Sequence, residues 1–84
     1  MTEKIIGSVS DFFSHPVVAG IELSDKLEVG DTIKIKGHTT DIEFIINSMQ
    51  IDHHEVPEAE PGDSIGVKVP ERVRKGDLVM KETA

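Results

Sequence analysis

The sequence contains no cysteine, no tryptophan and no tyrosine, and it has phenylalanine at only three positions. Without cysteine the chain has no disulfide, no thiolate metal site and no thiol nucleophile. No apolar run approaches the roughly 20 residues that cross a bilayer, and the first residues lack the apolar stretch of a signal peptide. These absences predict a cytoplasmic protein that does not enter a membrane.

The length and net charge of the chain further restrict the class of protein to which it can belong. The 84 residues include 16 acidic and 9 basic side chains, for a net charge of -7, and 37% are hydrophobic. A chain of this length and composition supports one hydrophobic core. Residues 1–84 are therefore predicted to form a single domain with its core at about residues 5–80. The acidic balance disfavours nucleic-acid backbones and acidic membrane surfaces as partners.

Strand patterns run through the chain. Apolar and polar residues alternate in residues 32–36 and 64–69, as is typical of half-buried strands. The side chains expected to face the core are Ile33, Ile35, Ile65, Val67 and Val69. Residues 42–51 alternate too, but the parity changes near Asn47-Ser48, which predicts a β-bulge or bend there. No segment shows a helical stripe.

Further strands are predicted near both ends. Residues 5–13 and 17–23 are β-rich and flank Ser14-His15-Pro16, which predicts a hairpin or paired corner, and residues 78–80 form a last short strand. Gly-Asp precedes a strand three times, at Gly30-Asp31, Gly62-Asp63 and Gly76-Asp77. Glycine permits the positive φ of a tight turn, and Asp can bond the nearby backbone. About six strands spaced by about ten residues predict an all-β fold that is closed or nearly closed.

The same segments resemble a known family. The resemblance is carried by residues 27–37, 49–51, 59–67 and 75–79. They resemble domain 2 of translational GTPases such as elongation factor Tu, and residues 37–53 are most similar to stand-alone elongation-factor-like proteins. Related domains also occur at the end of collagenase-like peptidases. The resemblance implies a small six-stranded Greek-key β-barrel.

The resemblance does not extend to GTPase activity. No Gly-x-x-x-x-Gly-Lys-Ser/Thr loop is present, so the chain is not expected to bind or hydrolyse GTP. The positions that hold the aminoacyl end of tRNA in the family fall on Ile6, Gly7, Val9, Asp52 and Ser64, so that pocket chemistry is not retained. The implied function is a non-catalytic binding module, associated with translation or RNA. The alternative is a detached accessory domain that docks on an enzyme such as a collagenase-like peptidase.

Histidines are the only side chains that suggest metal or catalytic chemistry. His53 and His54, beside Asp52 and Glu55, could bind zinc or nickel, but adjacent residues on extended backbone point in opposite directions, which favours a solvated strand end. His15 and His38 lack a recognisable nucleophile and carboxylate beside them. No catalytic, cofactor or metal residue is therefore predicted.

Partner contacts have two candidate regions. The loop His38, Thr39, Thr40 and Asp41 either shapes a turn or contacts a partner. The basic side chains are Lys34, Lys36 and Lys68 on outward strand positions and Arg72, Arg74 and Lys75 in the loop before the last strand. They are either solvated or contact RNA phosphates. A protein or ribonucleoprotein partner is expected, and binding to a membrane is not expected. The oligomeric state stays open.

Overall fold

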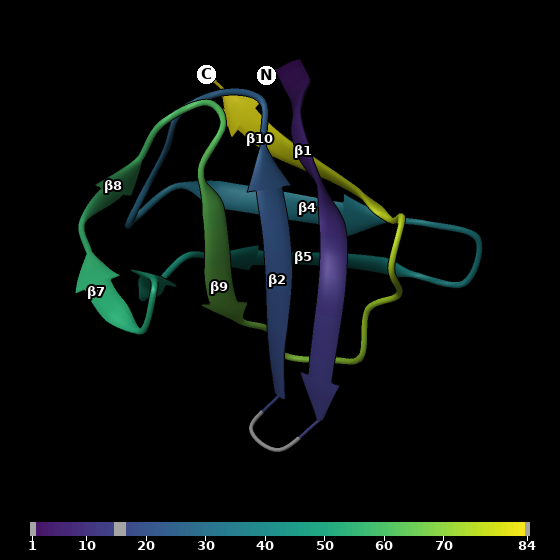
Figure 1. Cartoon of the computed structure of the whole chain (residues 1–84). Helices are drawn as coiled ribbons and strands as arrows, with labels where there is room; N and C mark the ends of the chain where they lie inside the picture. The colour runs from purple at the N-terminus through teal and green to yellow at the C-terminus, as the bar shows by residue number, and fades with distance from the viewer. Residues whose placement is uncertain (1, 15–16, 84) are drawn as a thin grey trace.

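The computed structural model describes residues 2–14 and 17–83 of the chain. These residues form ten strands and no helix (Figure 1). The strands are β1 (Thr2–Ser14), β2 (Val17–Leu23), β3 (Leu27–Glu28), β4 (Thr32–Lys36), β5 (Asp41–Ile45), β6 (Met49–Ile51), β7 (His54–Val56), β8 (Glu58–Ala59), β9 (Ser64–Lys68) and β10 (Leu78–Thr83). His15 and Pro16, between the two strands of the predicted hairpin, lie outside the described residues.

Eight strands form one antiparallel sheet in the order β5-β4-β10-β1-β2-β9-β6-β7, and β3 pairs with β8 separately. Figure 1 shows β9, β2 and β1 as a front layer with β4 and β5 crossing behind them, so the large sheet bends over on itself. The all-β prediction is confirmed. The sheet is nevertheless open, with β5 and β7 as edge strands, and it does not reproduce the expected six-stranded Greek-key barrel.

The open edge has a local cause. β5 ends at Ile45 and β6 begins at Met49, so the predicted bend near Asn47-Ser48 is confirmed. After the bend, β6 pairs with β7 and with only Gly66 and Val67 of β9. The segment predicted as one bent strand is thus two strands with different neighbours. The remaining missed strands, β3, β7 and β8, have two or three residues each, too few to show an alternating pattern.

The core lies between the two layers and consists mainly of aliphatic side chains. The largest fully buried side chains are Ile6, Val9, Ile21, Leu27, Ile33, Ile35, Ile46, Met49, Val67, Val73 and Val79. The five side chains predicted from the alternating pattern to face the core are all buried, none more than 7% exposed. The aromatic rings of Phe12 and Phe44 are partly buried and pack against this cluster. Burial of apolar surface on this scale is the main force that stabilises the fold.

The three Gly-Asp turns have one geometry, as the sequence predicts. Each glycine has a φ of 95–99°. In each turn the Asp carboxylate accepts a backbone N–H from the residue three positions earlier, at 2.8–2.9 Å; the pairs are Glu28 with Asp31, Glu60 with Asp63, and Arg74 with Asp77. A strand follows each turn, namely β4, β9 and β10. The turns therefore fix where three strands of the large sheet begin.

The predicted hairpin of β1 and β2 is also confirmed. It contains a β-bulge that was not predicted from the sequence. The register shifts between Val9 and Asp11, so Ser10 is an extra residue on β1 opposite Gly20. Such a bulge bends the strand and redirects its side chains. Residues 2–14 and 17–83 contain no helix that could span a membrane.

Candidate functional site

The loop at residues 37–41 meets the loop that precedes β10. The Nε of Arg74 donates a hydrogen bond to Oγ1 of Thr39 at 2.9 Å. The buried Asp77 carboxylate lies against Gly37 so closely that a Cβ at Gly37 would collide with it. Two regions that the sequence singles out separately are therefore parts of one edge of the molecule.

The candidate contact residues differ in how accessible they are. His38, Thr39 and Asp41 are exposed, whereas Thr40 is only 5% exposed. Thr40 shapes the turn instead, because its carbonyl accepts the N–H of Gly37 at 2.8 Å. Thr40 therefore fits the turn-shaping alternative, because its side chain is buried. Contact of the loop with a partner stays a prediction.

The basic side chains fall into two groups. Four lysines form ion pairs; they are Lys4, Lys26, Lys34 and Lys81. Lys34 Nζ lies 2.9 Å from a Glu3 carboxylate oxygen, and this hydrogen bond raises the pKa of Lys34 above its ordinary value. The other basic residues are Lys36, Lys68, Arg72, Arg74 and Lys75, and they form no ion pair within residues 2–14 and 17–83. We call Lys36, Arg72, Arg74 and Lys75 the cationic edge.

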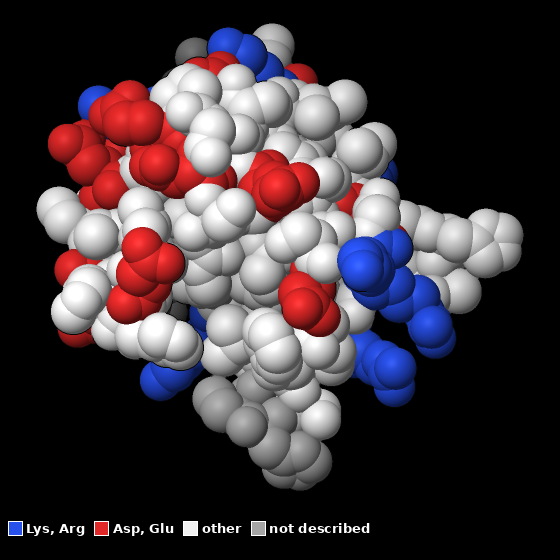
Figure 2. All heavy atoms as spheres, viewed as in Figure 1, with Lys and Arg blue, Asp and Glu red and all other residues white. Residues whose placement is uncertain are grey.

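The charges are segregated on the surface. Figure 2 shows acidic groups gathered at the left over β7 and β8, and basic groups at the right over the segment that joins β9 to β10. Arg72 on this edge lies over the ring of Phe12, 5.8 Å from the ring centroid. Between the two charged regions, the face over β9, β2 and β1 has no basic cluster and only isolated acidic groups among uncharged residues.

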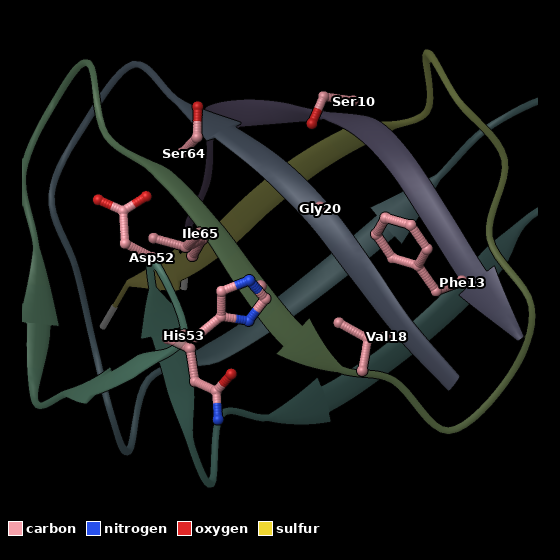
Figure 3. Close-up of a pocket in the computed structure, with 10 residues that line it drawn as sticks. Ser10, Phe13, Val18, Gly20, Asp52, His53, Ser64 and Ile65 are labelled. Atoms are coloured by element: carbon pink, nitrogen blue, oxygen red, sulfur yellow. The ribbon is translucent and has the colours of Figure 1, made fainter. Parts of the chain in front are cut away.

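This face contains a groove of ≈ 560 Å³. Its lining residues, which define the outer groove, are Ser10, Phe13, Val18, Gly20, Gln50, Asp52, His53, Ser64, Ile65 and Gly66. Figure 3 shows Phe13 and Val18 at one end and Asp52 and Ser64 at the other. The two ends therefore differ, since one is apolar and the other is polar and acidic.

Two of the groove residues occupy positions that the elongation-factor resemblance points to. Asp52 and Ser64 line the groove, whereas Ile6, Gly7 and Val9 are buried. Of the remaining groove residues, the sequence singles out only His53 and Ile65, and for other reasons. The groove residues come together because β1, β2, β9 and β6 are neighbours in the sheet, an order that the sequence does not reveal.

His53 reaches the groove from a strained turn. Asp52 and His53 form the two-residue turn of the β6–β7 hairpin, with φ values of 51° and 66°. Glycine is strongly preferred in such turns because a Cβ is disfavoured at positive φ. The sequence interpretation of His53 as part of an extended strand end is therefore wrong. Across the described ranges, no three His, Asp or Glu side chains are placed to hold a metal ion.

The turn predicts an unusual stabilising substitution. His53→Gly should raise the free energy of unfolding by about 1 kcal/mol, because glycine removes the left-handed strain. His54→Gly, on the adjacent strand β7, is the matched control and should lower it by about 0.5–1 kcal/mol. Urea denaturation of the three proteins measures both effects. Equal destabilisation by the two substitutions would show that the turn is not strained.

Comparison with known proteins gives one sequence relative. No family model matches the chain. The chain is 47% identical over 81 residues to an uncharacterised protease of Methanocaldococcus jannaschii. The match covers 93% of this chain and 20% of that protein, so the chain spans about a fifth of the length of the curated relative that it matches.

Solved structures share the fold. The C-terminal domain of a protein from Geobacillus thermoleovorans, assigned to the U32 peptidases, superposes with a TM-score of 0.88 at 17% identity, covering 95% of this chain and 93% of that one. Its selenomethionine variant gives 0.86 at 15% identity, covering 90% and 96%. The chain therefore has the fold of this class of peptidase C-terminal domain.

These findings correct the family prediction. The sequence relative is described as a protease, and both structures are of the C-terminal domain of a protein described as a U32 peptidase. Identification of the chain as an elongation-factor-like protein resembling domain 2 of translational GTPases is therefore wrong. The expected ribonucleoprotein or RNA partner is unsupported for the same reason. Much of the misleading resemblance consists of Gly-Asp turns. The hydrogen bonds of these turns show that the residues shape the backbone just before a strand begins.

Proposed function

We propose that this chain is a non-catalytic accessory module of a U32-type peptidase and that it docks on the peptidase polypeptide. The observation that carries the proposal is the 47% identity over 81 residues to a stretch that makes up only 20% of the M. jannaschii protease. The other four fifths of that protein lie outside the match, and the catalytic residues are expected there. The shared fold with a peptidase C-terminal domain supports the same assignment.

The surface of the chain suits docking. It offers an open groove and a separate cationic edge, which together present apolar, acidic and basic contacts. Interfaces between proteins combine an apolar centre with a polar rim in this way. The exposed His38, Thr39 and Arg74 are proposed to contact acidic groups of the peptidase, and Asp41 is proposed to contact a basic one, in a cytoplasmic complex. Residues 1–84 are proposed to act as one folding unit.

A capture experiment tests the proposal. The tagged chain is incubated with lysate of the organism that encodes it, with and without ribonuclease, and the bound proteins and RNA are identified. We expect a U32-type peptidase polypeptide to be retained in a one-to-one complex and to survive ribonuclease. An unrelated acidic β domain of similar size, tagged in the same way, is the control.

Two results would contradict the assignment. Retention of ribosomal proteins or tRNA that disappears on ribonuclease treatment would restore a role in translation. Hydrolysis of a protein substrate by the purified chain alone would show that the module is itself catalytic. Neither result is expected, because the chain corresponds to so small a part of its relative.

A further inference from the structure

Two glycines lie side by side in the outer groove. Gly20 on β2 pairs directly with Gly66 on β9. In the same row, Gly20 faces Asp11 on β1, and Gly66 also faces Gln50 on β6. Since strand residues alternate between the two faces of a sheet, these four positions lie on the outer face. The floor of the groove is therefore bare backbone where two central strands meet.

Only one of these two glycines is explained by the packing of this chain. A Cβ at Gly20 would lie 3.2 Å from Ser10 Oγ and 3.3 Å from Asp11 Cβ, because the β1 bulge crowds that position. A Cβ at Gly66 would meet nothing closer than Val18 Cγ1, at 3.6 Å, which is ordinary contact. Gly66 is also absent from the described glycines with positive φ.

Glycine at position 66 thus weakens its strand without a local reason. A glycine inside a strand costs stability, and such a residue often marks a place where another backbone or a ligand approaches closely. The strained turn beside it points the same way, because Asp52 and His53 hold positive φ values and both line the groove. Unfavourable backbone geometry of this kind gathers at sites of interaction.

The charge and shape of the outer groove define which kind of ligand it can bind. The lining includes Asp52, and Asp11 adjoins it, while the lining contains no Lys or Arg. The groove is open along the surface between its apolar end at Phe13 and Val18 and its acidic end at Asp52 (Figure 3). An extended polypeptide lying on bare sheet backbone matches this shape better than a small molecule, which needs a more enclosing pocket.

We propose that the outer groove docks an extended segment of the peptidase polypeptide, with apolar side chains at the Phe13 end and a Lys or Arg at the Asp52 end. This inference rests on the proposed accessory function and names the surface that performs it. The segment comes from the part of the peptidase outside the matched 81 residues, which is about four fifths of the M. jannaschii relative.

The test blocks the groove with a side chain that the fold tolerates. Gly66→Leu fills the floor, Gly66→Ala adds one methyl group, and Glu43→Leu places the same leucine on an exposed position of β5, outside the groove. Thermal unfolding and amide spectra first establish that each variant folds. Affinity for the purified peptidase polypeptide from the capture experiment is then measured.

Gly66→Leu is expected to weaken binding by at least ~10-fold, with Gly66→Ala intermediate and Glu43→Leu within about 2-fold of the parent. The amide signals of Gly20 and Gly66 should shift on binding. Asp52→Asn should weaken binding about 3-fold and reduce its sensitivity to salt, because one charge pair is lost.

The outcomes separate the two proposals. If the parent chain binds the peptidase and Gly66→Leu binds equally well, the groove is not the docking surface and the accessory function stands. If Asp52→Asn leaves both affinity and salt dependence unchanged, the segment carries no cation at that end. If the folded parent chain does not bind the peptidase at all, the accessory function fails and the groove proposal fails with it.

Discussion

Ile21→Ala is expected to lower the free energy of unfolding by about 3 kcal/mol. Ile21 lies in the middle of β2, is 0% exposed and pairs with both Val9 and Ile65. Truncation removes buried methyl groups and leaves a cavity that the neighbouring strands cannot fill. A domain of 84 residues has a total stability of about 4–13 kcal/mol. The substitution therefore removes a large share of it.

Ile45→Ala is the matched control. Ile45 is at the end of edge strand β5 and is 56% exposed. Its loss should change stability by no more than about 0.5 kcal/mol, as is usual for surface positions. Urea unfolding monitored by far-ultraviolet circular dichroism measures both variants. Similar losses from the two substitutions would mean that the core is not where the structure places it.

Asp77→Ala is expected to lower the free energy of unfolding by about 2 kcal/mol. Asp77 is 6% exposed, and its carboxylate accepts the N–H of Arg74 at 2.8 Å. It also packs against Gly37, so it links the loop before β10 to the loop at residues 37–41. Its removal leaves a partly buried backbone donor without this partner and loosens the cationic edge.

Asp63→Ala provides the comparison within the same kind of turn. Asp63 accepts the N–H of Glu60 at 2.8 Å but is more exposed than Asp77. Water can replace its hydrogen bond, so the expected loss is about 1 kcal/mol. Equal losses at Asp63 and Asp77, measured by urea unfolding, would show that the contact with Gly37 adds nothing to stability.

Local features of the fold could be predicted from the sequence. The Gly-Asp turns require only a positive φ at Gly30, Gly62 and Gly76 and a carboxylate one residue later. Each strand that follows has a side-chain pattern set by burial on one face. Such features depend on residues close together in the chain, so propensity and periodicity are enough to find them.

The groove could not be predicted, because it depends on residues far apart in the sequence. Gly20 and Gly66 are neighbours only because β2 and β9 pair in one register. The turn at Asp52 and His53 was equally hidden, since neither residue is the glycine that usually signals such a hairpin. Sites formed by strand order require the structure.

The family error has a related cause. Turn residues that begin strands recur in unrelated β proteins, so they report on strand entry more than on function. The fold prediction that followed from the resemblance, an all-β domain, is therefore correct. The predicted association with translation is wrong. The peptidase alternative, which rested on the same barrel resemblance, is the one that the sequence relative and the structural neighbours favour.

Calorimetric titration of the purified chain into the captured peptidase polypeptide tests the accessory function most directly. We predict saturable binding with one chain per peptidase and a negative heat-capacity change, because apolar groove surface is buried. A peptidase preparation that is active and folded, yet gives no binding heat at several temperatures and no complex in sedimentation, would contradict the account.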